Sequence, residues 1–118
     1  MDLHVKIWIE HEKKAVFGEG RRRLLVLVDE TGSLNKAAKE MKMSYRAAWG
    51  KIKDAEKRLG LPLLERKTGG RQGGGSRLTE AGRTLVDQFD QLKNALEKDA
   101  QKHFQRFEKV TLKKDAQK

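Results

Sequence analysis

The stretch Ser33–Arg83, SLNKAAKEMKMSYRAAWGKIKDAEKRLGLPLLERKTGGRQGGGSRLTEAGR, decides the expected fold. It holds a short helical pattern, a break, a longer helical pattern with a basic side, and a glycine-rich basic loop. A short helix, a turn and a longer helix make a helix-turn-helix, and a basic hairpin after the second helix makes a wing. The stretch therefore predicts a winged helix-turn-helix.

Two serines are placed to cap the two helices of this unit, because a serine side chain accepts a backbone N–H at a helix start. Ser33 precedes one apolar stripe, formed by Leu34, Ala37, Ala38 and Met41. Ser44 precedes a helix expected over 45–59, which Gly60 and then Pro62 end. At 100° per residue, one side of the longer helix carries Ala48, Ile52, Ala55 and Leu59, the opposite side carries Arg46, Gly50, Lys53 and Lys57, and Trp49 lies on the flank. Two amphipathic helices of a bundle would show the same pattern, so this alternative stays open.

The segment after Pro62 predicts the wing. An apolar run over 61–65 is strand-like, five of the seven residues over 69–75 are glycine, and Leu78-Thr79 ends the return strand. The basic residues in this segment are Arg66, Lys67, Arg71 and Arg77. A nucleotide-phosphate loop is excluded because no lysine follows Gly74, where that motif requires one. A flexible linker is the remaining alternative, and it would not need the arginines.

Charge is concentrated in the same stretch. The 118 residues carry a net charge of +10, of which residues 33–83 contribute +8 through 13 Lys/Arg against 5 Asp/Glu. A local basic surface favours a polyanionic partner. Cysteine is absent, the N-terminal residues are too charged for a signal peptide, and no apolar run approaches membrane length. We therefore expect a cytoplasmic protein that does not enter a membrane.

The segments before Ser33 are expected to support this unit. Leu3, Val5, Ile7 and Ile9 alternate with mostly polar residues, which predicts a half-buried strand, and residues 15–18 form a second strand or a turn. Residues 21–30 read as a core helix that stops at Gly32. The arginines over 21–23 would be a solvated helix end or would contact phosphate.

A long helix is expected after the Thr79 cap. Its apolar residues step at heptad-like spacing and then continue after a slip: Leu85, Phe89, Leu92, Leu96, Phe104 and Phe107. A helix over 80–108 is about 44 Å long, more than one small domain covers, so these side chains are expected to form a homodimer interface. The alternative is that the first half packs on its own domain and the rest is solvated. The expected division is 1–79 for the DNA-binding domain, 80–110 for the dimerisation helix and 111–118 for a frayed tail.

No pattern of catalytic or metal-binding residues is present. His4, His11 and His103 are far apart, serines and threonines fall at caps and turns, and no metal-ligand spacing or nucleophile motif occurs. We expect neither an enzyme nor a metal site.

Two long segments of this stretch, SYRAAW and ERKTGGRQGGGSRLT, closely resemble the N-terminal DNA-binding domain of the ModE family of molybdenum transport regulators. A looser resemblance, to the winged helix of LysR-type regulators, covers TGSLNKAAKEMKMS. The ModE resemblance implies a homodimeric winged-helix regulator that binds palindromic operators. In that family, further C-terminal domains sense molybdate, and a chain ending at Lys118 has no room for them. We therefore expect no cofactor in this chain; an effector that binds elsewhere, a separate sensor protein and the absence of an effector stay open.

DNA contacts are expected on both helices and on the wing. A dimer would place two recognition helices about 34 Å apart in successive major grooves of a pseudo-palindrome. Arg46 is expected to read guanine, and Gly50 to let the helix seat closely. The full set of expected DNA-binding residues is Ser33, Asn35, Lys36, Ser44, Tyr45, Arg46, Trp49, Gly50, Lys53, Lys57, Lys67, Thr68, Arg71 and Arg77. Two alternatives are a sequence-tolerant, chromatin-type DNA-binding protein and a protein-interaction adaptor that uses the long helix.

Overall fold

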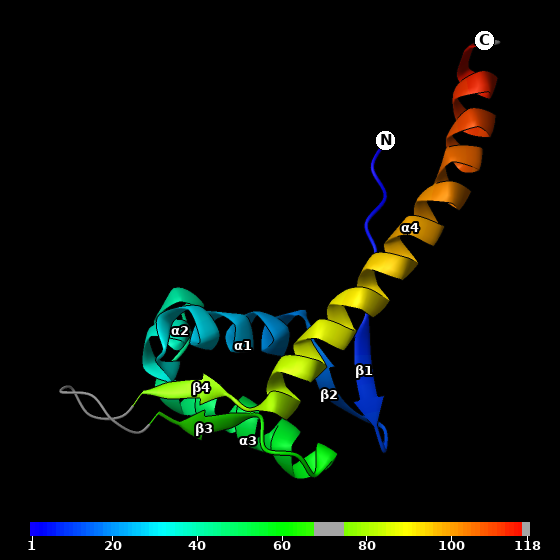
Figure 1. The fold of residues 1–118 in the computed structure, drawn as a ribbon. Coiled ribbons are helices and arrows are strands. Elements are labelled where there is room, and N and C mark those ends of the chain that lie inside the picture. The colour runs from blue at the N-terminus through cyan, green and yellow to red at the C-terminus, as the bar shows by residue number, and fades with distance from the viewer. Residues whose placement is uncertain (68–74, 117–118) are drawn as a thin grey trace.

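The computed structural model describes residues 1–67 and 75–116 and has a mainly helical, winged-helix architecture (Figure 1). The elements, in chain order, are β1 (Trp8–His11), β2 (Lys14–Gly18), α1 (Glu19–Thr31), α2 (Leu34–Glu40), α3 (Tyr45–Leu59), β3 (Leu64–Arg66), β4 (Ser76–Leu78) and α4 (Glu80–Ala116). The strands form two antiparallel hairpins, β1–β2 and β3–β4. The expected fold class is confirmed. None of the helices in the described part of the chain is both long and apolar enough to span a membrane.

The core lies where α1, α2 and α3 meet. α1 buries Leu24, Leu25, Leu27 and Val28, while the facing helices contribute mainly alanines: Ala37, Ala38, Ala48 and Ala55. Small side chains allow helix axes to approach closely, and Ile52 fills the space between them. The sequence periodicity predicted the buried stripe of α3. Because this stripe packs in the core, the opposite side of α3 faces outward.

The ends of the helices follow the cap residues. The Ser33 hydroxyl oxygen accepts the Lys36 N–H at 3.1 Å, and the Ser44 hydroxyl oxygen accepts the Ala47 N–H at 3.0 Å. α1 and α3 end at Gly32 and Gly60, with φ of 72° and 70°, a left-handed conformation that glycine adopts without strain. The starts of α2 and α3 and the ends of α1 and α3 are thus set by nearby residues, and α3 has the bounds expected from the sequence.

The N-terminal hairpin corrects the expected strand. β1 begins only at Trp8, and its four residues are all exposed, so the alternation from Leu3 does not mark a half-buried strand. The pairing of Trp8 with Gly18 is the last of the hairpin, because β2 gives way to α1 at Glu19 and leaves the preceding residues no strand to pair with. The expected second strand is present, with Val16 and Phe17 buried.

The arginines at the start of α1 hold the fold together. The Arg21 Nε donates to the Lys51 carbonyl of α3 at 3.1 Å, and Arg22 forms an ion pair with Asp90 of α4. The hydrogen bond that Arg22 donates to the Asp90 carboxylate raises the pKa of the Arg22 guanidinium above its ordinary value, against the opposing effect of burial. For these two residues, neither a solvated helix end nor phosphate contact describes their role; Arg23 alone is exposed.

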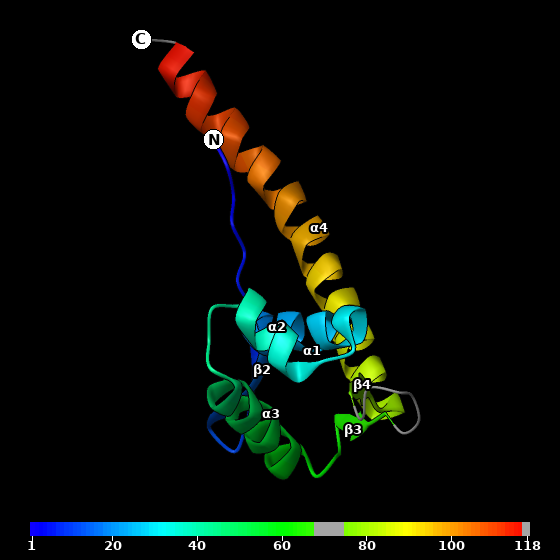
Figure 2. The ribbon, with the colours of Figure 1, turned by 90° about the vertical axis from the view of Figure 1, so that its left-hand side faces the viewer.

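α4 leaves the domain as one long helix, as Figures 1 and 2 show, and gives the molecule extents of 69 × 30 × 22 Å. Near its start, Phe89 packs edge-to-face on Phe17 with ring centroids 5.1 Å apart. The helix continues to Ala116, so the expected boundary at residue 110 is too early and Thr111–Ala116 is helical. This segment contains good helix formers, and the Thr111 hydroxyl donates to the Phe107 carbonyl at 2.9 Å.

Candidate nucleic-acid interface

The outer side of α3 is a basic and aromatic surface. The residues that the helical wheel placed opposite the core or on its flank are all exposed, and so is Tyr45 at the start of the helix. The wheel residues are Arg46, Trp49, Gly50, Lys53 and Lys57. The Trp49 side chain is 48% exposed, and the Lys53 ammonium lies 5.7 Å from its ring centroid. Trp49 is therefore not packed beneath the wing, which was one of two sequence interpretations. This side presents cations, hydrogen-bond donors and ring faces to any bound partner.

Gly50 lies in the middle of this surface and is not required by the fold. A Cβ atom built on Gly50 meets no heavy atom within 4 Å, and its backbone is that of an ordinary helix. Glycine within a helix costs about 0.5–1 kcal/mol relative to alanine. The position thus lowers helix stability and keeps the centre of the outer side flat.

Lys53 joins this surface to the wing through Glu56. The Lys53 ammonium lies 3.0 Å from a Glu56 carboxylate oxygen, and that carboxylate accepts the backbone N–H groups of Leu63 at 2.7 Å and Leu64 at 3.2 Å. Burial alone would raise the pKa of Glu56, but these three donors together hold it below its ordinary value. Lys53 thus has a structural partner in addition to its expected phosphate contact, and Glu56 fixes the start of β3 relative to α3.

The wing is an antiparallel hairpin whose base is fastened to the rest of the domain. Leu64 pairs with Leu78, and the Lys67 N–H donates to the Gly75 carbonyl at 3.0 Å. The Ser76 N–H donates to the Gly32 carbonyl at 2.9 Å, and a Cβ on Gly75 would stand 2.4 Å from that carbonyl oxygen, so only glycine fits there. The wing therefore has a fixed direction relative to α1 and α2.

Two of the four wing residues expected to contact DNA can be placed. Lys67 is exposed at the end of β3, while Arg77 is exposed but forms an ion pair with Glu65 on the opposite strand at 2.8 Å. Thr68 and Arg71 lie outside the described residues.

A polar hollow of about 350 Å³ lies where α2, α3 and the wing come together. It brings together three residues that the sequence analysis selected, Ser33, Asn35 and Tyr45, and adds Arg66 and Ser76. Arg66 is exposed, and its guanidinium is the cation of this hollow. Arg66 was not among the predicted site residues, because its place before Lys67 in the sequence does not show that β3 folds beside the starts of α2 and α3. Of the remaining predicted residues, Lys36 is exposed three residues after the Ser33 cap, and Ser44, the cap of α3, is exposed as well.

The expected dimer residues divide into two groups. Phe89 is 4% exposed and packs in the core of its own chain, so its assignment to a dimer interface is wrong, and Leu85 is half-buried against the same core. Farther along α4, Leu92, Leu96 and Phe107 are 43%, 42% and 58% exposed, and Phe104 stacks on Phe107 with ring centroids 6.1 Å apart. The outer part of α4 thus carries an apolar surface, and its use by a second copy stays a prediction.

The sequence matches the family described as "Bacterial regulatory helix-turn-helix protein, lysR family" over residues 21–83, more than half of the chain. Among curated relatives, it is 41% identical over 86 residues to the transcriptional regulator ModE of Haemophilus influenzae, covering 72% of this chain and 34% of the relative. It is 45% identical over 69 residues to the molybdenum transport protein ModE of Azotobacter vinelandii, covering 58% and 26%. The chain thus spans about a third or less of the length of these relatives.

Solved structures show the same fold. The crystal structure of VV2_1132, a LysR family transcriptional regulator, matches with a TM-score of 0.52 at 24% identity, covering 66% of this chain and 25% of that one. The crystal structure of the CbnR_DBD–DNA complex matches with a TM-score of 0.54 at 23% identity, covering 70% and 90%.

Proposed function

Because this chain belongs to the bacterial regulatory helix-turn-helix proteins of the lysR family, we propose that it binds DNA at specific sequences and regulates transcription. The observation that carries this proposal is the outer side of α3, where exposed Arg46, Tyr45 and Lys57 face away from a core that fixes the helix. A helix with donors on one exposed side fits the major groove, which is wide enough to admit it.

In the proposed complex, the start of α3 reads the bases. Arg46 binds a guanine edge through two hydrogen bonds, and Tyr45 and Ser44 contact phosphate or base edges where the helix begins. Lys53 and Lys57 neutralise phosphates along the groove. The wing follows the backbone or enters the minor groove, and it contributes Lys67 and Arg77 from the described residues together with Thr68 and Arg71.

We further propose that two copies bind a pseudo-palindromic operator. The support is the apolar surface of outer α4, whose Leu92, Leu96 and Phe107 side chains would lose much of their exposed area in a helix pair. The two α3 helices would then enter major grooves about one turn, or ~34 Å, apart. Sedimentation equilibrium tests this arrangement, and a strict monomer at micromolar concentration would contradict it.

The name of the Azotobacter vinelandii relative, molybdenum transport protein ModE, suggests a connection with molybdenum. We propose that residues 1–118 bind DNA without a cofactor and that any molybdate is sensed outside these residues, for instance by a separate sensor protein. Operator affinity measured with and without molybdate, at fixed ionic strength, is expected to be the same. A molybdate-dependent change in affinity would contradict this part of the proposal.

Selection from random DNA duplexes, followed by sequencing, tests sequence-specific binding. We expect one enriched palindromic site, and Arg46→Ala to lose about 1–3 kcal/mol of binding free energy on it and to relax one base position. Arg23→Ala is a matched control for base reading, because it removes the same charge from an exposed position on α1 and should leave the preferred base at every position unchanged. An unenriched pool would favour a chromatin-type protein, and weak binding to every duplex near physiological salt would favour an interaction adaptor.

A further inference from the structure

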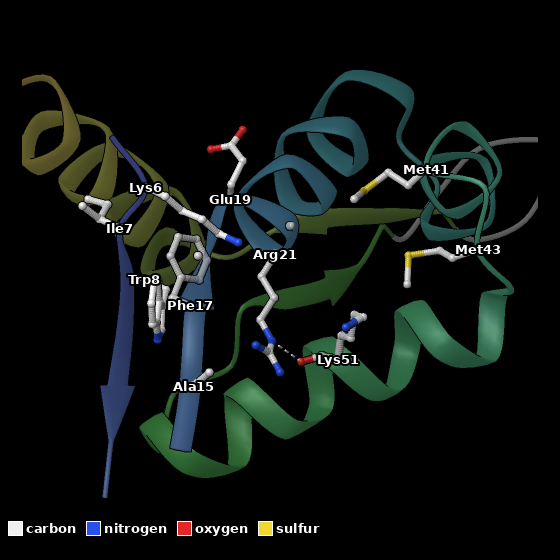
Figure 3. Close-up of a pocket in the computed structure, with 12 residues that line it drawn as sticks. Lys6, Ile7, Trp8, Ala15, Phe17, Glu19, Arg21, Met41, Met43 and Lys51 are labelled. Carbon is white, nitrogen blue, oxygen red and sulfur yellow. Dashed lines mark hydrogen bonds between the residues drawn. The ribbon is translucent and has the colours of Figure 1, made fainter. Parts of the chain in front are cut away.

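A second cavity, of about 600 Å³, lies between the N-terminal hairpin, the start of α1 and the turn that joins α2 to α3 (Figure 3). It shares no lining residue with the polar hollow beside the wing. Its volume falls within the range of about 300–1,000 Å³ that is typical of small-molecule sites. The DNA-binding proposal gives this cavity no role.

The walls of the cavity are mostly apolar. Ile7, Trp8 and Phe17 line the hairpin side, and Figure 3 shows the Met41 and Met43 side chains reaching toward it from the α2–α3 turn. Methionine side chains are flexible and polarizable, so they adapt to the shape of a bound ring. These walls favour an occupant with a flat apolar body.

Three cations surround this apolar space. Lys6, Arg21 and Lys51 come from three separate parts of the chain and line the same cavity (Figure 3). The Lys6 ammonium lies 6.0 Å from the Trp8 ring centroid. Glu19 also lines the cavity, but its carboxylate binds Arg22 at 3.3 Å and Lys93 at 3.4 Å. The Lys6 and Lys51 ammonium groups therefore give the cavity a positive charge.

Arg21 is held in place and so gives the cavity a fixed cation. Its Nε donates to the Lys51 carbonyl at 3.1 Å, and its guanidinium pairs with Asp54 at 3.4 Å. A Cβ built on Gly20 meets nothing within 4 Å, so the space beside Arg21 is open. A guanidinium has five N–H donors, of which these contacts use only part.

We propose that this cavity binds a small organic anion, one with a flat apolar body and a carboxylate or sulfonate group. The apolar walls take the body out of water, and the cations bind the anionic group through charge-assisted hydrogen bonds. An inorganic anion would leave the walls unused, and a neutral ring would leave the cations unused. Met43 directly precedes the Ser44 cap of α3, so the occupant contacts the residue before the cap of the recognition helix.

Methionine methyl NMR with 1-naphthoate as the probe tests the proposal on the full chain. The chain has three methionines: Met41 and Met43 line this cavity, while Met1 lines a separate groove against α4. We expect the Met41 and Met43 methyl signals and the Trp8 indole signal to shift saturably. The Trp49 indole, on the outer side of α3, and the Met1 methyl are expected to stay unchanged.

Two controls separate charge recognition from general hydrophobic binding. Lys51→Gln is expected to weaken 1-naphthoate binding about tenfold, and Lys39→Gln, which removes an exposed lysine of α2 outside the cavity, is expected to leave it unchanged. The neutral 1-naphthalenemethanol is expected to bind about tenfold more weakly to the native chain. Shifts confined to Met1, no shift at millimolar probe, or equal binding by the two variants would each overturn the proposal.

Discussion

Replacing Gly50 with alanine should raise the stability of the fold and weaken DNA binding at the same time. The added methyl group has open space around it in the free protein and removes the cost of a glycine inside a helix. We expect unfolding to require about 0.5–1 kcal/mol more free energy, which corresponds to a rise in Tm of about 2–6 °C for a chain of this size.

The loss of DNA binding follows from the same methyl group. If a base edge or a phosphate sits against the backbone at Gly50, a Cβ at about 1.5 Å from the Cα forces it to retreat by a similar distance. Hydrogen bonds fail beyond about 3.5 Å, so the contacts of Arg46, one helical turn away, would break. Loss of a bidentate base contact costs about 1–3 kcal/mol, or about 5- to 150-fold in affinity.

Fluorescence anisotropy with the selected operator at fixed salt measures the affinity, and thermal unfolding followed by circular dichroism measures the stability. Gly20→Ala is the matched control: it is an exposed helix glycine with the same open space, on α1. It should leave operator affinity unchanged. A Gly50→Ala protein that is more stable but binds the operator within twofold of the native affinity would refute the close approach of α3.

Three further predictions concern how the domain holds its interface. Gly82→Ala is expected to destabilise the fold by about 1–3 kcal/mol in urea unfolding, because the new Cβ would stand 2.4 Å from the Leu63 carbonyl oxygen, and a stability equal to that of Gly50→Ala would contradict this packing. Phe89→Ala should cost about 3–5 kcal/mol of folding free energy, because it loses its contact with Phe17. Leu92→Ala should cost less than about 1 kcal/mol of folding free energy and should instead promote dimer dissociation in sedimentation. The reverse pattern would mean that Phe89 lies in the dimer interface. Glu56→Gln should destabilise the protein by about 1–3 kcal/mol at pH 7. Since the pKa of Glu56 is lowered in the folded protein, its carboxylate stabilises the fold above the ordinary pKa of 4.5 and loses that effect as the pH falls through the folded pKa. The difference in unfolding free energy between the native protein and Glu56→Gln should therefore shrink below about pH 4. A difference that does not change with pH would rule out this role.

The sequence predicted those features that depend on neighbours in the chain. The Ser44 cap, the left-handed Gly60 and the buried stripe between them act within a few residues, and so the bounds and the outward side of α3 followed directly. Partners distant in the chain were not predictable in this way. The heptad-like spacing of α4 places Phe89 on an apolar stripe, but it cannot show whether Phe89 packs on Phe17 of the same chain or on a second copy.

The predicted N-terminal strand was wrong and Arg66 was missed from the site for related reasons. Alternation from Leu3 to Ile9 reports polarity, whereas a strand also needs a partner, and β2 is too short to pair with residues before Trp8. Arg66 gained significance only when folding brought β3 beside the starts of α2 and α3. Both outcomes depend on how segments meet in space, which a single-chain pattern does not record.

The ion pairs of Arg22 with Asp90 and of Glu19 with Lys93 join α1 to α4 and hold the angle at which α4 leaves the domain. α4 continues to Ala116, so its part beyond Asp90 is about 39 Å long, and a tilt of about 5° there would move its far end by about 3 Å. If two copies pair along the outer part of α4, the tilt that these four charged side chains hold would set the distance between the two α3 helices. Exchanging one of them would change which operator spacing fits, with every base-reading residue left in place.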